Sequence, residues 1–530
     1  MKLEKKSLRE AEEWKKAGYE LPEYDLDIIQ ANTKKKPTWI HFGAGNIFRA
    51  FMAVAQQKLL NEKISDTGII VCEGYDSEII EKVYRKYDNL TIAVSMKQNG
   101  SMDKMVVGSV AESLLLKPET FDWLRLKEIF ENPALQMATF TITEKGYQIK
   151  NASGYLPQIK EDMQVGPEQA KSYMGCLTAL CYLRYLAGKL PLALVSMDNF
   201  SHNGDRLKTA VLTIAEVWEK NNLVEEGFSG YLQDETKISF PWSMIDKITP
   251  RPDSKIKEML ERTGLEGMDI FTTSANTYIA PFVNAEETEY LVIEDNFPNG
   301  RPKLEHAGIL FADRRTVECV EQMKVCTCLN PLHTGLAIFG CLLSYTSISK
   351  EMEDPLLREL AVQIGQEGMP VVVHPGILEP KQFLQEVLCV RLPNPYIPDT
   401  PQRIATDTSQ KISIRYGETI KAYQKTGKSL KQLRAIPLVI AGWIRYLTGV
   451  DDFGNAMELS PDPRMTELRE KISDIAEKPE MVAGSILADA SVFGQDLSKT
   501  ELAEPVIGFL KEMLTGPHAV RKTLEKYLGQ

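Results

Sequence analysis

The sequence predicts an α/β fold, with a doubly wound N-terminal domain followed by a mostly α-helical C-terminal domain, and three observations carry this prediction. The first is a short apolar strand, Trp39–Phe42, followed at once by a glycine turn and a helical pattern. The second is a series of apolar strands that alternate with helical stretches up to about residue 221. The third is helical periodicity that dominates from about residue 303 onward. Alternating strands and helices are typical of a parallel sheet covered by helices.

The glycine turn predicts a dinucleotide site. A strand, a tight glycine turn and a helix N-terminus form the phosphate-binding turn of a Rossmann-type domain. Gly43 allows the turn and Gly45 lets the backbone approach a pyrophosphate, although Phe48 stands where a third glycine is usual. Arg49 adds a cation for the pyrophosphate. The residues expected to bind the dinucleotide here are Gly43, Gly45, Asn46, Ile47 and Arg49.

The second strand, expected at residues 68–72, ends next to an acidic residue. Glu73 is placed where a carboxylate accepts the adenosine ribose hydroxyls, and Asp76 is the alternative. Either carboxylate would repel a 2′-phosphate, so the sequence favours NAD over NADP.

Two later strand ends carry polar groups that point to chemistry. Glu144 follows one strand and Asn199 the other, and the carboxyl ends of parallel strands face the ligand crevice. Turn and helix-capping chemistry is the competing explanation for both. The further strands are expected at 91–95, 105–110, 136–142 and 192–197, and the helices between them include 168–188 and 204–221.

Length and composition set the domain organisation. The 530 residues exceed one ordinary core, so two domains are expected. We expect an N-terminal arm at 1–36, a Rossmann-type domain at 37–302 and an α-helical substrate domain at 303–530, joined at the turn-rich Asp295–Pro302. Within the irregular stretch before this connection, Asp246 either contacts a polyhydroxylated substrate or caps a turn.

Charge and hydropathy narrow the class of partner. The net charge of −11 argues against a nucleic-acid groove or an anionic membrane surface as the main partner. We expect no membrane segment, because no apolar run is long enough and the first residues are charged. The sequence therefore suggests a cytoplasmic protein with a small-molecule substrate, acting as a monomer or small homo-oligomer.

The segment Lys324–His333 concentrates potential catalytic groups. Pro331 suits the first position of a helix, so Asn330 is expected to cap a helix that carries His333 in its first turn. The helix dipole disfavours imidazolium there and leaves a neutral ring. Lys324, if desolvated, loses its proton more easily and can act as a general base. The ordinary alternative is a C-terminal lysine on one helix and a cap on the next.

Two further observations concern the helical half. Arg403 and Lys411 are eight residues apart, about two helical turns, and so can line one anionic pocket or one solvated face. Cys326 and Cys328 stand near His333, but they lack the spacing of a structural zinc site. We expect reduced cysteines and no metal.

The combination of motifs resembles the polyol-specific long-chain dehydrogenases and reductases, the mannitol dehydrogenase family. The resemblance covers residues 38 to 415 in family order and implies a Rossmann-type domain, a helical C-terminal domain, a nicotinamide cofactor and a metal-independent mechanism. The segments that carry it are Gly43–Arg49, Thr143–Tyr147, Asp198–Asn199, Asp246–Pro250, Lys324–His333 and Asn394–Asp399, with Arg403 and Lys411.

The resemblance also implies a role for each matched residue. Lys324 matches the catalytic lysine, Asn199 and Asn330 match the amides that hold the reacting oxygen, and His333 matches the substrate-binding histidine. Glu144 matches an acid near the proton exit path, and the residues that match contacts to distal hydroxyl or acid groups are Asp246, Arg403 and Lys411. One departure is that five residues, rather than the usual four, separate Lys324 from Asn330. We expect the helix break at Pro331 to absorb the extra residue.

Within the family, the chain length and the segment Cys328–His333 look most like the hexuronate reductases that interconvert fructuronate and mannonate. The expected function is NAD-dependent hydride transfer to C2, or an equivalent carbon, of a keto sugar acid. Alternatives are a tagaturonate reductase and a mannitol 2-dehydrogenase. A different class also stays open, namely a dinucleotide-binding redox sensor without turnover.

Overall fold

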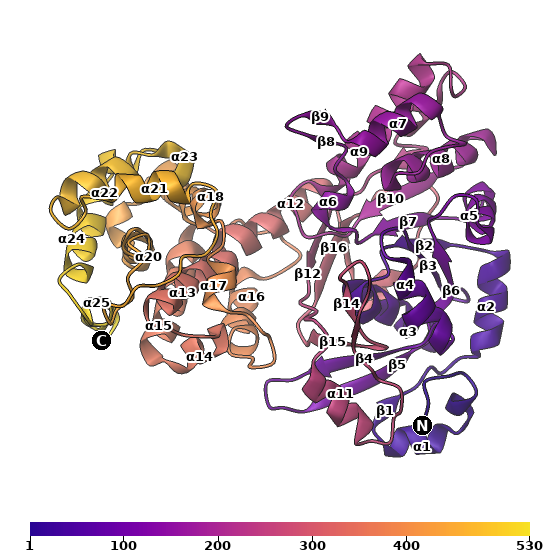
Figure 1. Ribbon diagram of the computed structural model, residues 1–530, viewed down its shortest axis with the longest axis horizontal. Coiled ribbons are helices and arrows are strands. Elements are labelled where there is room, and N and C mark those ends of the chain that lie inside the picture. The colour runs from indigo at the N-terminus through magenta and orange to yellow at the C-terminus, as the bar shows by residue number, and fades with distance from the viewer. Residues whose placement is uncertain (530) are drawn as a thin grey trace. The chain divides into compact units, whose positions relative to one another are not determined.

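The computed structural model describes residues 1–529, and the chain divides into two compact units (Figure 1). The first unit is Met1–Val317, and the second begins at Glu318.

The first unit is built on a six-stranded, fully parallel sheet. Its strand order is β11-β10-β7-β2-β3-β6, the order of a doubly wound dinucleotide-binding fold. The order reverses between β2 and β7, and ligands of such folds bind beside this switch point. The strands are β2 (Trp39–Phe42), β3 (Ile69–Glu73), β6 (Val110–Leu115), β7 (Met137–Phe140), β10 (Leu192–Ser196) and β11 (Ile238–Ser239).

Helices cover both faces of this sheet (Figure 1), and strand β2 shows how its residues divide between them. Ile40 and Phe42 pack into one core with α5 and α8, whereas Trp39 packs into the opposite core with α3. Successive strand residues point to opposite faces, which is why the central strands are mostly apolar on both faces. The helices of this unit are α1 (Ala11–Lys16), α2 (Leu26–Lys35), α3 (Ala53–Asn61), α4 (Ser77–Ile79), α5 (Phe121–Glu131), α6 (Thr143–Gly146), α7 (Pro157–Val165), α8 (Tyr173–Leu186), α9 (Asn203–Lys220), α10 (Phe228–Gln233) and α11 (Ser254–Glu261).

Two of the predicted strands do not form strands of the main sheet as we expected. Residues 91–96 form β4 of a separate four-stranded sheet, in the order β1-β5-β4-β15. The predicted strand 105–110 is divided between β5 and β6, because the chain leaves one sheet and enters the other at Gly108 and Ser109. The additional strands are β1 (Tyr19–Glu20), β4 (Thr91–Met96), β5 (Met102–Val107), β12 (Ser243–Asp246), β15 (Phe282–Glu286), β16 (Tyr290–Glu294) and β17 (Leu310–Ala312), with the short pairs β8 (Lys150–Asn151) and β9 (Gly154–Tyr155), and β13 (Phe271–Thr272) and β14 (Tyr278–Ile279).

The first 36 residues are an integral part of this unit rather than a surface arm. Trp14 is fully buried, and it packs with Leu3 and Tyr19 in a core shared with strands β4 and β5. Strand β1 also pairs with β5 in parallel. The apolar residues of this segment therefore belong to a second core.

The unit boundary lies beyond the expected division at residue 302. Strand β17 pairs in parallel with β16, and Leu304 is fully buried in the core beneath the main sheet. These contacts hold residues 303–317 in the first unit, so the turn-rich Asp295–Pro302 is a surface turn within it.

The second unit is helical, as predicted, but several of its helices contain wide π-helical turns. Three such turns are η6 (Lys324–Cys328), η8 (Val387–Arg391) and η9 (Ser413–Gly417). The α-helices are α13 (Asn330–Leu342), α14 (Ile348–Glu353), α15 (Pro355–Gly368), α16 (Pro380–Glu386), α17 (Pro401–Ile404), α18 (Thr408–Ile412), α19 (Glu418–Lys425), α20 (Ala435–Tyr446), α21 (Met465–Lys471), α22 (Pro479–Leu487), α23 (Ala490–Phe493), α24 (Ala503–Met513) and α25 (Ala519–Leu528), with α12 (Arg314–Met323) crossing the unit boundary.

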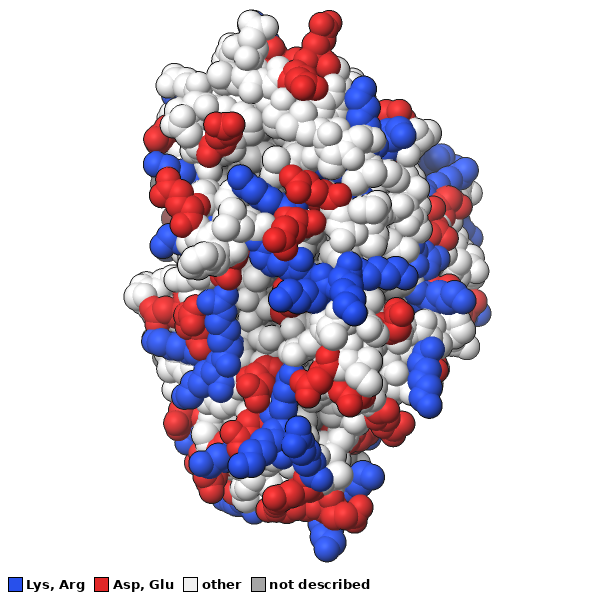
Figure 2. Space-filling model, turned by 90° about the vertical axis from the view of Figure 1, so that its right-hand side faces the viewer, with Lys and Arg blue, Asp and Glu red and all other residues white. Residues whose placement is uncertain are grey.

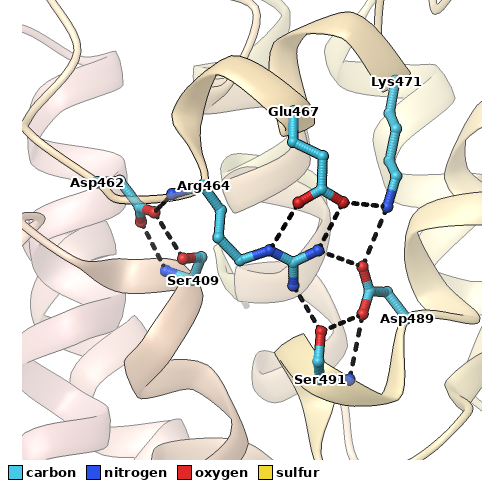
Figure 3. Close-up of polar contacts among 7 residues, drawn as sticks. All are labelled: Ser409, Asp462, Arg464, Glu467, Lys471, Asp489 and Ser491. Carbon is cyan, nitrogen blue, oxygen red and sulfur yellow. Dashed lines mark hydrogen bonds and ion pairs between the residues drawn. The ribbon is translucent and has the colours of Figure 1, made fainter. Parts of the chain in front are cut away.

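An ion-pair network joins the later helices of this unit (Figure 3). Arg464 contacts Glu467 and Asp489 at 2.7 Å each, and Lys471 contacts the same two acids. Just before this network, Asp462 accepts hydrogen bonds from the N–H and hydroxyl of Ser409 on α18. The network thus supports the helix that also carries Lys411.

A carboxyl group is buried within this unit. Glu351 of α14 is fully buried, and neither of its oxygens has a hydrogen-bond partner among the described residues. Gly340 makes room for it, because a Cβ at that position would lie 2.0 Å from Glu351 Oε1. Burial, with a smaller contribution from Asp354, raises the pKa of Glu351 well above its usual value.

We expect Glu351→Gln to weaken the dependence of stability on pH. Above the unfolded pKa of about 4.5, the unfolded chain releases a proton that the folded chain keeps, so rising pH lowers the free energy of unfolding until the folded pKa is passed. Thermal unfolding measured at about pH 5 and about pH 8 should show a smaller loss of stability between the two pH values for the variant than for the wild type. The exposed Glu353 gives the control Glu353→Gln, which should follow the wild type. An equal loss of stability between the two pH values in the wild type, Glu351→Gln and Glu353→Gln would contradict the raised pKa of Glu351.

The molecular surface carries both signs of charge. In Figure 2, Lys and Arg side chains gather in a band across the middle of one face, with acidic side chains on both sides of it. One helical run, Arg314–Leu342, is long and apolar enough to cross a membrane by composition, but 78% of its apolar window is buried within the protein. Burial of that kind is typical of a core helix.

Candidate active site

A cavity of about 600 Å³ lies at the carboxyl ends of β2, β3 and β7, beside the switch point of the sheet. Its walls come from the glycine turn, the end of β3, the turn after β7 and the start of α8. The residues that line the cavity include Gly43, Gly45, Glu73, Asp76, Thr143 and Tyr173. A ligand at the switch point of a doubly wound sheet would occupy this cavity.

The glycine turn has the geometry that a dinucleotide requires. Gly43 has φ +106°, and a Cβ there would lie 2.2 Å from the carbonyl oxygen of Thr141. No described atom lies within 4 Å of the place where a Cβ of Gly45 would stand, so the backbone is open to a ligand at that point. Open backbone at this position fits a pyrophosphate. Asn46 and Ile47 continue the turn into the π-helical segment η2 (Phe48–Met52).

Both candidate ribose-binding acids line the cavity. Glu73 ends β3, accepts the Ala44 N–H at 2.9 Å and so ties the glycine turn to the second strand. Asp76 caps the short helix α4 and accepts the hydroxyl of Thr273 at 2.5 Å. Each carboxylate keeps unused lone pairs for a ribose hydroxyl. The choice between the two stays open.

The expected role of Arg49 at the pyrophosphate was wrong. Its side chain is fully buried and points into the unit, where it donates to Ala280 O at 2.8 Å and to Asn46 Oδ1 at 2.7 Å. Burial lowers the pKa of Arg49 to about 10. The sequence did not reveal this because π-helical turns such as η2 have no reliable sequence signal.

The polar residues after β7, β10 and β12 differ in their exposure. Glu144 is exposed, and its carboxylate pairs with Arg206 at 3.2 Å. Asn199 is exposed in the loop after β10, and Asp246 is buried at the end of β12. Thr143, next to Glu144, has φ +63°, a strained conformation for a β-branched residue.

In the second unit, Lys324 is buried at the start of the π-helical turn η6. The Leu329 N–H donates to Lys324 O at 3.0 Å, which closes a turn one residue wider than an α-helical turn. This wide turn lies between Lys324 and Asn330, just before the break at Pro331.

Asn330 does not cap the following helix. It is the first residue of α13, Leu329 holds the cap position, and no side chain caps the helix. The Asn330 side chain is partly buried and has no hydrogen bond among residues 1–529. It is therefore available to a ligand rather than committed to the helix.

His333 lies in the first turn of α13, as predicted. Burial lowers the pKa of His333, Arg391 and Arg415 lower it further, and Asp399 opposes them. His333 Nε2 lies 3.3 Å from Asp399 Oδ2 without the alignment of a hydrogen bond. This ring nitrogen is buried and has no hydrogen-bond partner among the described residues.

Cationic side chains crowd around this histidine. Arg415 donates to Thr334, the residue after His333, and Arg403 pairs with Asp399. Burial, Arg415 and Arg403 lower the pKa of Lys411, whereas Asp407 and Asp462 raise it. Crowded cations of this kind suit an anionic ligand. The sequence patterns pointed to Arg403 and Lys411, but gave no signal for Arg415 or Arg391.

Of the two cysteines near His333, Cys328 is buried and Cys326 is half-buried. Burial raises the pKa of Cys326 and Cys328 to about 12 each, and the Cys328 thiol contacts Pro380 O at 3.7 Å. In the part of the chain that the structure describes, no three His, Cys, Asp or Glu side chains gather as metal ligands do.

Comparison with known families agrees with this geometry. The mannitol dehydrogenase Rossmann domain matches residues 37–306, and the mannitol dehydrogenase C-terminal domain matches residues 316–514. The chain belongs to the mannitol dehydrogenase family. The family's two domains match the two compact units closely, since the units divide at residue 317.

Two similar proteins are named D-mannonate oxidoreductase. The D-mannonate oxidoreductase of Thermotoga maritima is 53% identical, covering 100% of this chain and 99% of its own. The D-mannonate oxidoreductase of Escherichia coli is 29% identical, covering 89% of this chain and 93% of its own. Among solved structures, the mannitol 2-dehydrogenase of Pseudomonas fluorescens, in complex with NAD and D-mannitol, superposes with a TM-score of 0.70 at 26% identity and full coverage of both chains.

Proposed function

We propose that this protein is an NAD-dependent oxidoreductase that interconverts D-fructuronate and D-mannonate. The observation that carries the proposal is the 53% identity to a D-mannonate oxidoreductase over the entire chain. The helical unit supports it physically, because a sugar acid brings a carboxylate that must be paired once it is buried. The crowded cations Arg403, Lys411 and Arg415 provide that pairing.

We assign binding of the dinucleotide cofactor to the first unit. Gly43 and Gly45 leave the backbone open for the pyrophosphate of NAD, and Glu73 or Asp76 accepts the ribose hydroxyls. When bound, NAD accepts the hydride from the alcohol and NADH returns it to the ketone.

We assign proton transfer and stabilisation of the alkoxide mainly to the second unit. In the reductive direction, Lys324 donates a proton to the developing alkoxide, and Asn330 and Asn199 donate hydrogen bonds that stabilise its charge. His333 donates to a substrate oxygen while it remains neutral. Glu144 exchanges protons with solvent in this proposal, which its exposure supports.

A substrate panel tests the proposal directly. NADH oxidation should be fastest with D-fructuronate and much slower with D-tagaturonate and with fructose. A preference for fructose would assign the protein to mannitol 2-dehydrogenase activity, and a preference for tagaturonate to the corresponding reductase. Tight NADH binding without turnover on any of the three would instead favour a redox sensor. We propose a cytoplasmic location, consistent with the burial of its one long apolar helical run.

Cofactor choice is a separate expectation. Wild-type protein should prefer NADH over NADPH, because a carboxylate beside the ribose repels a 2′-phosphate. Either Glu73→Gln or Asp76→Asn should narrow this preference about tenfold, and the variant that does so identifies the residue that contacts the ribose. Kinetics with both cofactors measure the effect, and a wild-type preference for NADPH would contradict the assignment.

A further inference from the structure

Two loops that carry proposed catalytic residues follow neighbouring strands of the main sheet. Strands β7 and β10 pair in parallel, with Phe140 opposite Ser196. The chain after β7 passes through Thr143 and Glu144, and the chain after β10 passes through Asp198 and Asn199. Because parallel strands end at the same edge, the two loops start side by side (Figure 1).

The side chain of Asp198 joins these loops. Its Oδ2 accepts the Ile142 N–H at 2.9 Å and the Tyr147 hydroxyl at 2.6 Å, and its Oδ1 accepts the Thr143 N–H at 3.0 Å. Ser196 at the end of β10 donates to the same Tyr147 oxygen at 2.9 Å. One carboxylate thus accepts three hydrogen bonds from a single turn.

This carboxylate holds a strained backbone. Thr143 has φ +63°, which a β-branched residue adopts only where its surroundings enforce it. The N–H groups of Ile142 and Thr143 both donate to the Asp198 carboxylate. The carboxylate therefore fixes the peptide groups on both sides of the Ile142 Cα.

The same turn forms one wall of the dinucleotide cavity. Thr141, Ile142 and Thr143 line the cavity, and the Thr141 carbonyl lies where a Cβ of Gly43 would clash. A movement of the turn would therefore be transmitted to the glycine turn. On the other side, the main-chain oxygen of Asp198 accepts the Phe200 N–H at 3.0 Å and so shapes the loop that contains Asn199.

We propose that Asp198 is a positioning residue that sets the turn after β7 as a wall of the dinucleotide cavity and, through its own main chain, orients the loop of Asn199. It acts through these two loops. The part of this proposal that concerns turnover rests on the proposed function, whereas the part that concerns cofactor binding does not.

Three variants of the full-length protein test the proposal. Asp198→Asn replaces an acceptor oxygen with an NH₂ group that faces an N–H donor, and Tyr147→Phe removes only one of the three donors. Glu219→Gln is the matched control, because Glu219 also accepts two backbone N–H groups, from Gly227 and Ser229, but it does not line the cavity.

The readouts are NADH affinity by fluorescence titration, steady-state kinetics and thermal unfolding. We expect Asp198→Asn to raise the Kd and KM for NADH about tenfold or more and to lower kcat, with a change of less than about twofold in the KM for the sugar acid. Tyr147→Phe should change the same parameters in the same direction by a smaller factor. Glu219→Gln should lower thermal stability and leave the Kd for NADH unchanged.

Each outcome decides the proposal. If Asp198→Asn loses stability as Glu219→Gln does but keeps its NADH affinity within about twofold, the carboxylate is only a structural contact and the proposal is overturned. If Asp198→Asn does not fold, an unchanged NADH Kd in Tyr147→Phe overturns it. A raised NADH Kd in a protein whose wild type reduces no sugar acid supports the positioning role and rejects the proposed function instead.

Discussion

Lys324→Ala is expected to reduce turnover by about 10² to 10⁴ from lost acid/base catalysis alone, with further loss from the missing charge beside the alkoxide. Lys324 is buried at the start of a wide helical turn, so water does not easily replace its ammonium group. Steady-state rates with D-fructuronate measure the loss. NADH affinity should stay near the wild-type value, because the dinucleotide cavity belongs to the other unit.

The control for this variant is Lys350→Ala. Lys350 is an exposed lysine on α14 of the same unit and pairs only with the neighbouring Glu353. Its loss should leave turnover unchanged. Near-normal turnover in Lys324→Ala would show that another group transfers the proton, and the residues of the wide turn η6 would then need to be reassigned.

Arg403→Ala is expected to lower kcat/KM for D-fructuronate by about 10- to 100-fold, the usual range for a charge-assisted hydrogen bond to a carboxylate. The loss with fructose should be much smaller, because a neutral polyol or ketose needs hydrogen bonds but no positive charge. Arg403 is largely exposed and pairs with Asp399, so its guanidinium can turn toward a substrate without leaving a buried hole.

Comparison of acid and neutral substrates in one variant separates the two possible roles of Arg403. Equal losses for both would show a general hydroxyl contact rather than a carboxylate site. Arg358→Ala, which removes an exposed arginine from α15, is the control and should change neither rate. Lys411 and the buried Arg415 remain in the variant, so a residual preference for the acid is expected.

Local sequence patterns predicted much of the fold because they report on short-range physics. Strand β2, the tight turn at Gly43 and the following helix were visible as an apolar run, a residue free to adopt positive φ and a helical period. Strands buried on both faces are apolar throughout, so β3, β7 and β10 were also found. Strand pairing is not local, which is why β4 was assigned to the wrong sheet.

Local patterns also predicted the positions of some candidate site residues but not of others. Gly43, Gly45 and Glu73 line one cavity because a strand end and the turn beside it are fixed by a few neighbouring residues. Arg49 belongs to the same motif, but its side chain is buried and donates to Ala280 O. A contact with a segment so far along the chain cannot be predicted from the local pattern.

The sequence by itself determined the α/β character of the first unit, the helical character of the second, the glycine turn and the presence of Lys324, Asn330 and His333 within one short segment. Only the tertiary structure decided which groups surround that segment. Asp399 and Arg415 reach His333 from elements that lie more than sixty residues further along the chain, and Asp198 reaches the turn after β7 from the next strand of the sheet. Such contacts depend on packing between distant elements, and packing leaves no periodic signal in the sequence.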